Sequence, residues 1–163
     1  MYKSVLTLGT FDGVHRGHQR IIKKVVARAR MLGFRSVVLA FGMPPKLGHR
    51  PSDTHVLLTT LPEKIQILKR LGIHDVQVLV FDKKTASTLP ETFFTRRILH
   101  RCGAREMVVG PRVAFGKNRA GRLPVLKEYG KRYGVSIHLV GGISVQGQPV
   151  SSSGIRKRLT RAS

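Results

Sequence analysis

Apolar runs alternate with amphipathic stretches along the whole chain. The runs predict strands over residues 4–9, 36–41, 75–81, 106–110 and 135–140. The stretches between them predict helices over 15–32, 60–71, 88–100 and 123–133, and a last short helix after Ser151. This alternation is typical of parallel strands joined by crossover helices. We therefore expect an α/β fold, a Rossmann-like open doubly wound parallel sheet of about five strands with helices on both faces.

The predicted helix ends carry local signals. The tetrapeptide Thr-Leu-Pro-Glu occurs at 60–63 and again at 88–91, and a Thr followed three residues later by Glu predicts a capping box. Gly33 and Gly72 are placed to end the helices before them. Both tetrapeptides therefore predict the same kind of helix start. The predicted loops are 42–56, 111–121 and the stretch from Gly141 to Pro149.

Length and composition fit one globular domain. The chain has 163 residues, of which 41% are hydrophobic, and this suffices for a substantial core. Cys102 is the only cysteine, so no intrachain disulfide can form. The apolar run before Asp12 is too short for a signal peptide or a membrane span. These features predict a cytoplasmic protein with no membrane partner.

The net charge is unusual for a globular domain. Thirty Lys and Arg residues oppose eight Asp and Glu residues, which gives a formal charge of +22. A field of this sign attracts polyanions, and nucleotides, nucleic acids and anionic membranes all qualify. A generally basic surface without a dedicated partner is the alternative, so the charge alone selects none of them.

The turn after the first predicted strand carries the strongest chemical signal. Residues 9–18 are Gly-Thr-Phe-Asp-Gly-Val-His-Arg-Gly-His. His15 and His18 are three residues apart, so their imidazoles share one helix face, and Gly17 leaves room for a ligand. The first turn of a helix also offers unpaired N–H groups and the positive end of its dipole. The pattern predicts a phosphate site that stabilises negative charge as it develops.

Further motifs indicate a family that the chain resembles. They are, in order, residues 9–19, Leu57-Leu58-Thr59 with Glu63 and Lys64, Val109-Gly110, Phe115-Gly116-Lys117 with Arg119 and Gly121, and 150–156. In this combination the chain resembles the adenylyltransferase module of bacterial bifunctional riboflavin kinase/FAD synthetases, within the HxGH nucleotidyltransferase superfamily. The resemblance implies a single nucleotidyltransferase domain over 1–163, without the riboflavin kinase module.

The resemblance also implies an activity, namely transfer of AMP from ATP to FMN to give FAD and pyrophosphate. His15 and His18 would contact the ATP phosphates and stabilise the α-phosphate during in-line attack. Ser152, Ser153 and Arg156 would hold the β- and γ-phosphates from the opposite side. Gly9, Thr10 and Phe11 would line the nucleotide pocket, and the loop 111–121 would lie near the flavin. The other implied binding residues are Asp12, Gly17, Val109 and Gly110, and, within that loop, Phe115, Lys117 and Asn118.

Several of these residues have alternative interpretations. The chain offers no dedicated carboxylate cage, so we expect Mg²⁺ to arrive with ATP rather than in a protein site. The two histidines could bind zinc, although no third and fourth ligands stand at suitable spacing. Asp12 could take part in the reaction, or only organise the turn. Ser151, Ser152 and Ser153 could cap a helix, which uses the same N–H geometry as triphosphate binding.

A few positions depart from the family pattern. Residues 41–45 are Phe-Gly-Met-Pro-Pro where Phe-Asp-Pro-His-Pro is usual. Arg112 stands where an acidic or amide residue is usual, Val113 where an aromatic is usual, and Gly154 where an arginine is common. Two alternative functions therefore stay open. One is transfer to another phosphorylated acceptor, such as glycerol phosphate or phosphopantetheine. The other is a catalytically weakened homologue that binds nucleotides or nucleic acid.

Overall fold

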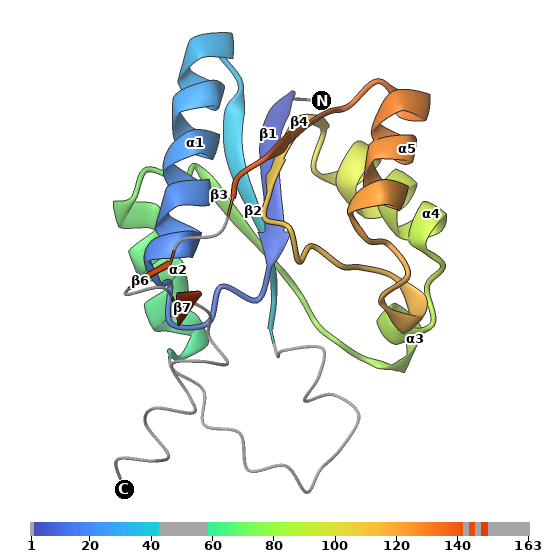
Figure 1. Ribbon diagram of the computed structural model, residues 1–163, viewed down its shortest axis with the longest axis horizontal. Coiled ribbons are helices and arrows are strands. Elements are labelled where there is room, and N and C mark those ends of the chain that lie inside the picture. The colour runs from blue at the N-terminus through green and yellow to red at the C-terminus, as the bar shows by residue number, and fades with distance from the viewer. Residues whose placement is uncertain (1, 43–58, 142–143, 146–147, 150–163) are drawn as a thin grey trace, which may run out of the picture.

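A five-stranded parallel sheet forms the centre of the protein. The computed structural model describes residues 2–42, 59–141, 144–145 and 148–149. The strands follow the order β3-β2-β1-β4-β5, and every neighbouring pair is parallel (Figure 1). Their bounds are Ser4–Gly9 for β1, Arg35–Phe41 for β2, Asp75–Leu79 for β3, Ala104–Val109 for β4 and Ser136–Leu139 for β5. The predicted doubly wound sheet is confirmed.

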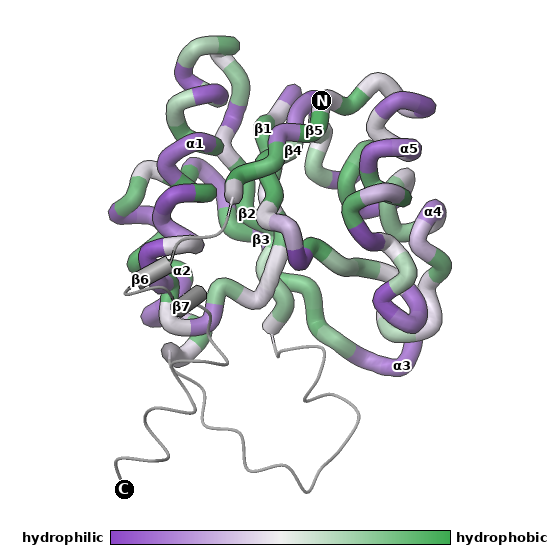
Figure 2. The backbone as a smooth tube through the Cα atoms, in the orientation of Figure 1, coloured by the Kyte–Doolittle hydropathy of each residue, from purple (hydrophilic) through white to green (hydrophobic). Residues whose placement is uncertain are grey.

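Helices cover both faces of this sheet, because successive side chains of each strand point to opposite faces. Val5 of β1 packs with α1 and α2, whereas the neighbouring Leu6 packs with α4, α5 and the π-helix. Figure 2 shows the strands coloured mostly as hydrophobic, with polar residues on the outer turns of the helices. The helices are α1 (Arg16–Leu32), α2 (Leu61–Arg70), α3 (Lys83–Ala86), α4 (Pro90–Phe93), the π-helix η1 (Phe94–Arg101), the 3₁₀-helix η2 (Lys117–Arg119) and α5 (Leu123–Tyr133).

Element ends with strong local signals fall where the sequence predicts them. Gly33 ends α1 with a φ of 67°, a left-handed conformation that glycine adopts without steric cost. Helix α5 occupies the predicted residues 123–133.

Strand β3 ends at Leu79, two residues earlier than predicted, because its partner β2 pairs through Phe41 and goes no further. Val80 beyond it is 68% exposed.

The second predicted capping box is wrong. The helix there begins at Pro90 and has Leu89 as its N-cap, with no side-chain cap bond, and it continues from Phe94 as a π-helix.

The stretch after Gly141, predicted as a loop, contains a short antiparallel pair, β6 (Ser144–Val145) with β7 (Gln148–Pro149). Most of the predicted loop 42–56 and the last predicted helix lie outside the described residues.

The carboxyl ends of the strands meet at one edge of the sheet, at the bottom of Figure 1. Helix α1 begins there, directly after β1, and the segments that follow β2, β3 and β4 leave from the same edge. In open parallel sheets this edge is where ligands bind. In the described part of the chain, no helix has the length and apolar character needed to cross a membrane.

Candidate active site

The turn between β1 and α1 holds an unusual backbone conformation. Phe11 and Val14 have φ values of 49° and 36°, and Gly13 between them has a φ of 79°. Positive φ is rare for side chains of this bulk and persists only where the surroundings fix it. Phe11 and Val14 are each 3% exposed and pack into the core between the sheet and α1. Burial of two apolar side chains therefore holds the turn in place.

His15 is the N-cap of α1. Its Nδ1 accepts hydrogen bonds from the backbone N–H groups of Gly17, at 3.1 Å, and His18, at 3.4 Å. Two of the N–H groups predicted to be unpaired are therefore satisfied by this imidazole. With Nδ1 as acceptor, the neutral ring carries its proton on Nε2, which remains a donor. Burial lowers the pKa of His15 below its usual value, so this tautomer persists at neutral pH.

His18 stacks on His15. The two ring centroids are 3.6 Å apart with an interplanar angle of 20°, and the edge of Phe11 contacts His18 at a centroid distance of 5.1 Å. Burial lowers the pKa of His18 to about 3, and the charges of His15 and Lys64 add to this effect, against an opposing effect of Asp12. Its Nδ1 is buried and has no hydrogen-bond partner among the described residues. The pair is therefore neutral, and one polar atom is left for a ligand or for a segment outside those residues.

Two glycines allow the aromatic rings to fold over the backbone. A Cβ on Gly17 would lie 3.0 Å from the Cε1 atom of His15, and one on Gly9 would lie 3.3 Å from the ring of Phe11. Gly17 was expected to leave room for a ligand. The room it leaves is occupied by the His15 ring, which it lets reach the N–H groups of the helix.

Asp12 organises the turn. It is 1% exposed and its Oδ1 accepts bonds from Thr59, from the backbone N–H at 3.0 Å and from the hydroxyl at 3.3 Å. The Thr59 hydroxyl oxygen in turn accepts a bond from the N–H of Gly13 at 3.2 Å. These contacts support the structural interpretation of Asp12, because its carboxylate is occupied by the backbone that precedes α2.

A cavity of about 950 Å³ opens at the same edge of the sheet. Four phenylalanines line it, and their rings contact one another. Phe93 stacks on Phe115 with centroids 5.4 Å apart, and Phe41 lies 6.4 Å from both Phe81 and Phe93. Polar groups from two segments complete the lining, namely Asp82, Lys83, Thr85, Ser87, Lys117, Asn118 and Arg119. An apolar aromatic floor with a cationic rim suits a planar aromatic ligand that carries negative charge.

Close backbone contacts fix the cavity walls. The N–H of Lys117 donates to the carbonyl of Thr88 at 2.7 Å, and a Cβ on Gly116 would lie 2.7 Å from the Cα of Pro90. Phe115 and Gly121 exchange backbone hydrogen bonds at 3.2 and 2.9 Å, which closes the loop between them. Asn118 has a φ of 57°, a strained conformation on the wall of the cavity.

The structure brings the predicted residues together in two groups. The imidazole turn holds Gly9, Thr10, Phe11, Asp12, His15, Gly17 and His18, and the cavity holds Phe115, Lys117 and Asn118. Val109 is 1% exposed, so its side chain belongs to the core, and Gly110 follows it against Ile21. Ser152, Ser153 and Arg156 lie outside the described residues.

Some functional candidates had no role assigned from the sequence. Phe81 and Phe93 line the cavity, and Phe41 was expected only to end a buried strand. Lys64 is 4% exposed on the buried face of α2 with Leu68. The sequence signal for Lys64 is its position, a lysine among the apolar residues on one face of the predicted helix 60–71. Thr59 belongs to one of the motifs that carry the family resemblance, but its contact with Asp12, 47 residues away, could not be predicted from the sequence.

No group of three or more His, Cys, Asp and Glu side chains within the described ranges has a metal-binding arrangement. In the same part of the chain, the carboxylate nearest to the imidazoles, that of Asp12, is bound to Thr59.

The fold defines the class of the protein, a Rossmann-like α/β protein, and the candidate site lies at the carboxyl edge of its sheet. The profile of the family described as FAD synthetase matches residues 1–154. A protein named putative bifunctional riboflavin kinase/FMN adenylyltransferase from Geobacillus thermodenitrificans is 34% identical, over 97% of this chain and 83% of its own length. The chain belongs to the FAD synthetase family.

More distant proteins are similar over most of the chain. The bifunctional riboflavin kinase/FMN adenylyltransferase of Haemophilus influenzae is 29% identical over 94% of this chain, which spans 50% of that protein. A structure titled macrolide-efflux protein from Streptococcus pneumoniae has a TM-score of 0.84 at 28% identity, over 96% of this chain and 50% of its own. Pantothenate synthetase from Thermus thermophilus, at 17% identity, shares the fold with a TM-score of 0.60, over 99% of this chain and 67% of its own.

Proposed function

We propose that this chain transfers the AMP group of Mg²⁺-ATP to the phosphate of FMN, giving FAD and pyrophosphate. An oxygen of the FMN phosphate attacks the α-phosphorus of ATP and forms a new P–O bond. The bond between the α-phosphorus and the bridging oxygen breaks, and pyrophosphate leaves with the electron pair. The observation that carries the proposal is the stacked neutral imidazole pair at the start of α1, on the same sheet edge as an aromatic cavity.

The imidazoles act as fixed hydrogen-bond donors in this reaction. The attacking phosphate is already an anion, so no protein base has to remove a proton. The need is to align two anions and to stabilise the charge that grows on the α-phosphate. His15 meets it with an Nε2–H donor, whose direction is fixed because Nδ1 caps the helix. A neutral imidazole suits this role, because it keeps one N–H group that can donate a hydrogen bond to the phosphate.

The cavity binds the flavin ring. Isoalloxazine is planar and aromatic, and the cavity lined by four phenylalanines offers such a ring apolar aromatic surroundings. The cationic rim formed by Lys83, Lys117 and Arg119 offsets the negative charge of FMN. The same floor gives a small acceptor such as glycerol phosphate nothing to stack on, so the cavity favours FMN over that alternative.

The triphosphate needs contacts from a second side. In this proposal Ser152, Ser153 and Arg156 hold the β- and γ-phosphates, and Gly9, Thr10 and Gly110 border the nucleotide. Mg²⁺ comes with ATP as part of the substrate, because phosphate oxygens are the ligands it prefers.

The test is a product assay with an acceptor panel. The protein is incubated with Mg²⁺-ATP and FMN, glycerol 3-phosphate or 4′-phosphopantetheine, and FAD and pyrophosphate are quantified by chromatography and a coupled assay. The proposal expects turnover with FMN as the only effective acceptor, and a kcat lowered by about 10²–10³ in a His18→Ala variant that folds normally. Pyrophosphate release only with another acceptor, or FAD formation unaffected by His18→Ala, rejects it.

The charge of +22 calls for one further measurement. Binding to duplex DNA is followed from about 50 to about 200 mM salt, the range over which phosphate-driven binding weakens steeply. Salt-labile binding beside robust FAD synthesis marks nucleic-acid contact as incidental. Salt-resistant binding without FAD synthesis supports the alternative of a nucleic-acid-binding homologue.

A further inference from the structure

The backbone before α2 is bonded to the imidazole turn. Thr59 donates to Asp12 twice, and its hydroxyl oxygen accepts from Gly13, so one residue bonds both positions at the centre of the turn. None of these bonds belongs to the helix itself. Thr60, the next residue, is the N-cap of α2 and completes the capping box with Glu63. Thr59 is therefore dispensable for starting α2, and its contacts serve the turn.

The positions bonded by Thr59 lie between two strained residues. Phe11 and Val14, with positive φ, stand on either side of Asp12 and Gly13. Strain of this kind relaxes when the contacts that enforce it are removed. His15 and His18 follow directly, and the stacking of their rings depends on the direction in which the chain leaves the turn. Thr59 is thus bonded, from outside the motif, to the part of the turn that precedes the imidazole pair.

We propose that Thr59 is a positioning residue for AMP transfer: through its bonds to Asp12 and Gly13, it sets the orientation of the imidazole pair. This inference rests on the proposed function, and Thr59 is assigned no contact with substrate. It adds to the HxGH turn one residue from a distant part of the sequence on which the geometry of that turn depends.

The first test compares Thr59→Val with Thr60→Val. Both replace a hydroxyl by a methyl group, at adjacent positions. Thr59→Val is expected to lower kcat by about 10- to 100-fold with a smaller change in the KM for ATP, the range that a misplaced reacting group produces. Thr59→Ser, which keeps the hydroxyl, restores most of the rate. Thr60→Val is expected to lower the melting temperature but to leave kcat within about twofold, because its bonds lie within α2.

The second test does not require activity. The ring ¹⁵N signals of His15 and His18 are followed by NMR in the free protein, as a function of pH. Thr59→Val is expected to shift the signals of both rings, and Thr60→Val to leave them in place.

The two tests separate the inference from the proposed function. If the unmodified protein makes no FAD but Thr59→Val changes the imidazole signals as stated, the function fails and the positioning stands. If the protein makes FAD while Thr59→Val keeps the full kcat and unchanged ring signals, the inference is overturned and the function stands. Equal losses of kcat in Thr59→Val and Thr60→Val also overturn it, since they indicate a role in helix stability only.

Discussion

The two Thr-Leu-Pro-Glu tetrapeptides have the same sequence and different structures. At 60–63 the Thr60 hydroxyl accepts from the N–H of Glu63 at 3.3 Å, and the Glu63 carboxylate accepts from the N–H of Thr60 at 3.0 Å. At 88–91 neither bond forms, and the helix starts one residue later, at Pro90. Four identical residues therefore do not determine how a helix begins.

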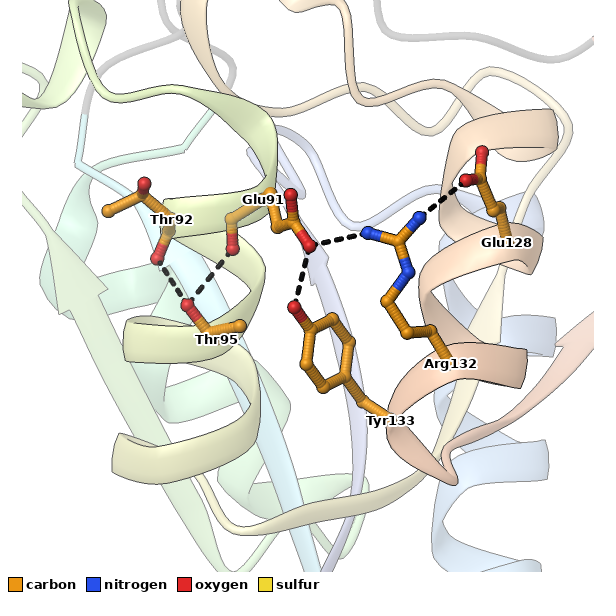
Figure 3. A network of polar contacts seen from close by, with 6 residues as sticks. All are labelled: Glu91, Thr92, Thr95, Glu128, Arg132 and Tyr133. Atoms are coloured by element: carbon orange, nitrogen blue, oxygen red, sulfur yellow. Dashed lines mark hydrogen bonds and ion pairs between the residues drawn. The ribbon is translucent and has the colours of Figure 1, made fainter.

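Tertiary partners account for the difference. The Thr88 hydroxyl donates to the carbonyl of Lys84 at 2.8 Å, at the end of α3, and the Thr88 carbonyl accepts from Lys117. The Glu91 carboxylate turns towards α5 and accepts from Tyr133 at 2.6 Å and from Arg132 at 2.5 Å (Figure 3). Because the Thr88 hydroxyl and the Glu91 carboxylate bond to these partners, neither takes part in a capping box, which contributes only about 1 kcal/mol.

Each tetrapeptide stands beside one half of the site. The first follows Thr59, which bonds the imidazole turn, and the second carries Thr88 and Pro90, which hold the wall of the aromatic cavity. We expect the first half to act on the chemical step and the second to act on binding of the acceptor. Substitutions in each half test whether the chemical step and acceptor binding are separated in this way, and they follow in order of decreasing effect.

His18→Ala disrupts the imidazole turn, the half of the site that we expect to act on the chemical step. Removing one fixed donor at a developing charge is expected to lower kcat by about 10²–10³, and FMN affinity should stay unchanged because the cavity is intact. Steady-state assays of FAD and FMN fluorescence titration measure the two quantities. His100→Ala, an exposed histidine on the π-helix, is the matched control and should keep full activity. A large loss of FMN affinity in His18→Ala would contradict the division.

Gly116→Ala disrupts the wall of the aromatic cavity, the half of the site that we expect to bind the acceptor. Gly116 has a φ of 75°, and a Cβ there would collide with the backbone of Pro90, so the wall between residues 115 and 119 must move. FMN affinity is expected to fall about tenfold, which corresponds to about 1.4 kcal/mol. Fluorescence titration with FMN measures it.

Gly134→Ala is the control for this change. Its φ of 73° carries the same strain of about 1 kcal/mol, but nothing lies within 4 Å of the added Cβ. It should lower stability without changing FMN affinity. Equal FMN affinities in the two variants would show that the contact with Pro90 does not shape the cavity.

Thr60→Val and Thr88→Val test the tetrapeptides themselves. Loss of an N-cap hydroxyl typically costs about 1 kcal/mol, so Thr60→Val should lower the free energy of unfolding by about that amount. Thr88→Val removes only an exposed bond to Lys84 and is expected to cost less than about 0.5 kcal/mol. Urea denaturation compares them. If Thr88→Val is as destabilising as Thr60→Val, the contrast between the two helix starts is wrong.

Tyr133→Phe gives the smallest effect, on the ionisation of Glu91. The hydrogen bond from Tyr133, and then the one from Arg132, hold the pKa of Glu91 below its usual value. Because the pKa is lower in the folded state, the stabilisation is present above the unfolded pKa of about 4.3 and is lost as the pH falls through the folded value.

Carboxyl-group NMR of Glu91 in both proteins measures this effect. The pKa should move up towards its usual value in Tyr133→Phe, and the acid end of the stability profile should shift with it. An unchanged titration of Glu91 would show that the bond drawn in Figure 3 contributes nothing to its charge state.

Local chemistry explains which predictions from the sequence succeeded. The end of α1 at Gly33, the capping box at Thr60 and the bounds of α5 depend on residues within a few positions of one another. The HxGH turn is equally local, so the sequence also indicates that His15 and His18 lie side by side. Because these residues are close neighbours along the chain, their contacts can be predicted from the sequence.

The remaining features depend on contacts between distant parts of the chain. Thr59 meets Asp12, Glu91 meets Tyr133 and four phenylalanines meet around one cavity only after the strands have paired. The sequence by itself determined the order of strands and helices and the pairing of the imidazoles. The tertiary structure decided which tetrapeptide forms a capping box and what holds the turn. The reason is physical, since a local motif contributes about 1 kcal/mol and a few long-range bonds suffice to redirect it.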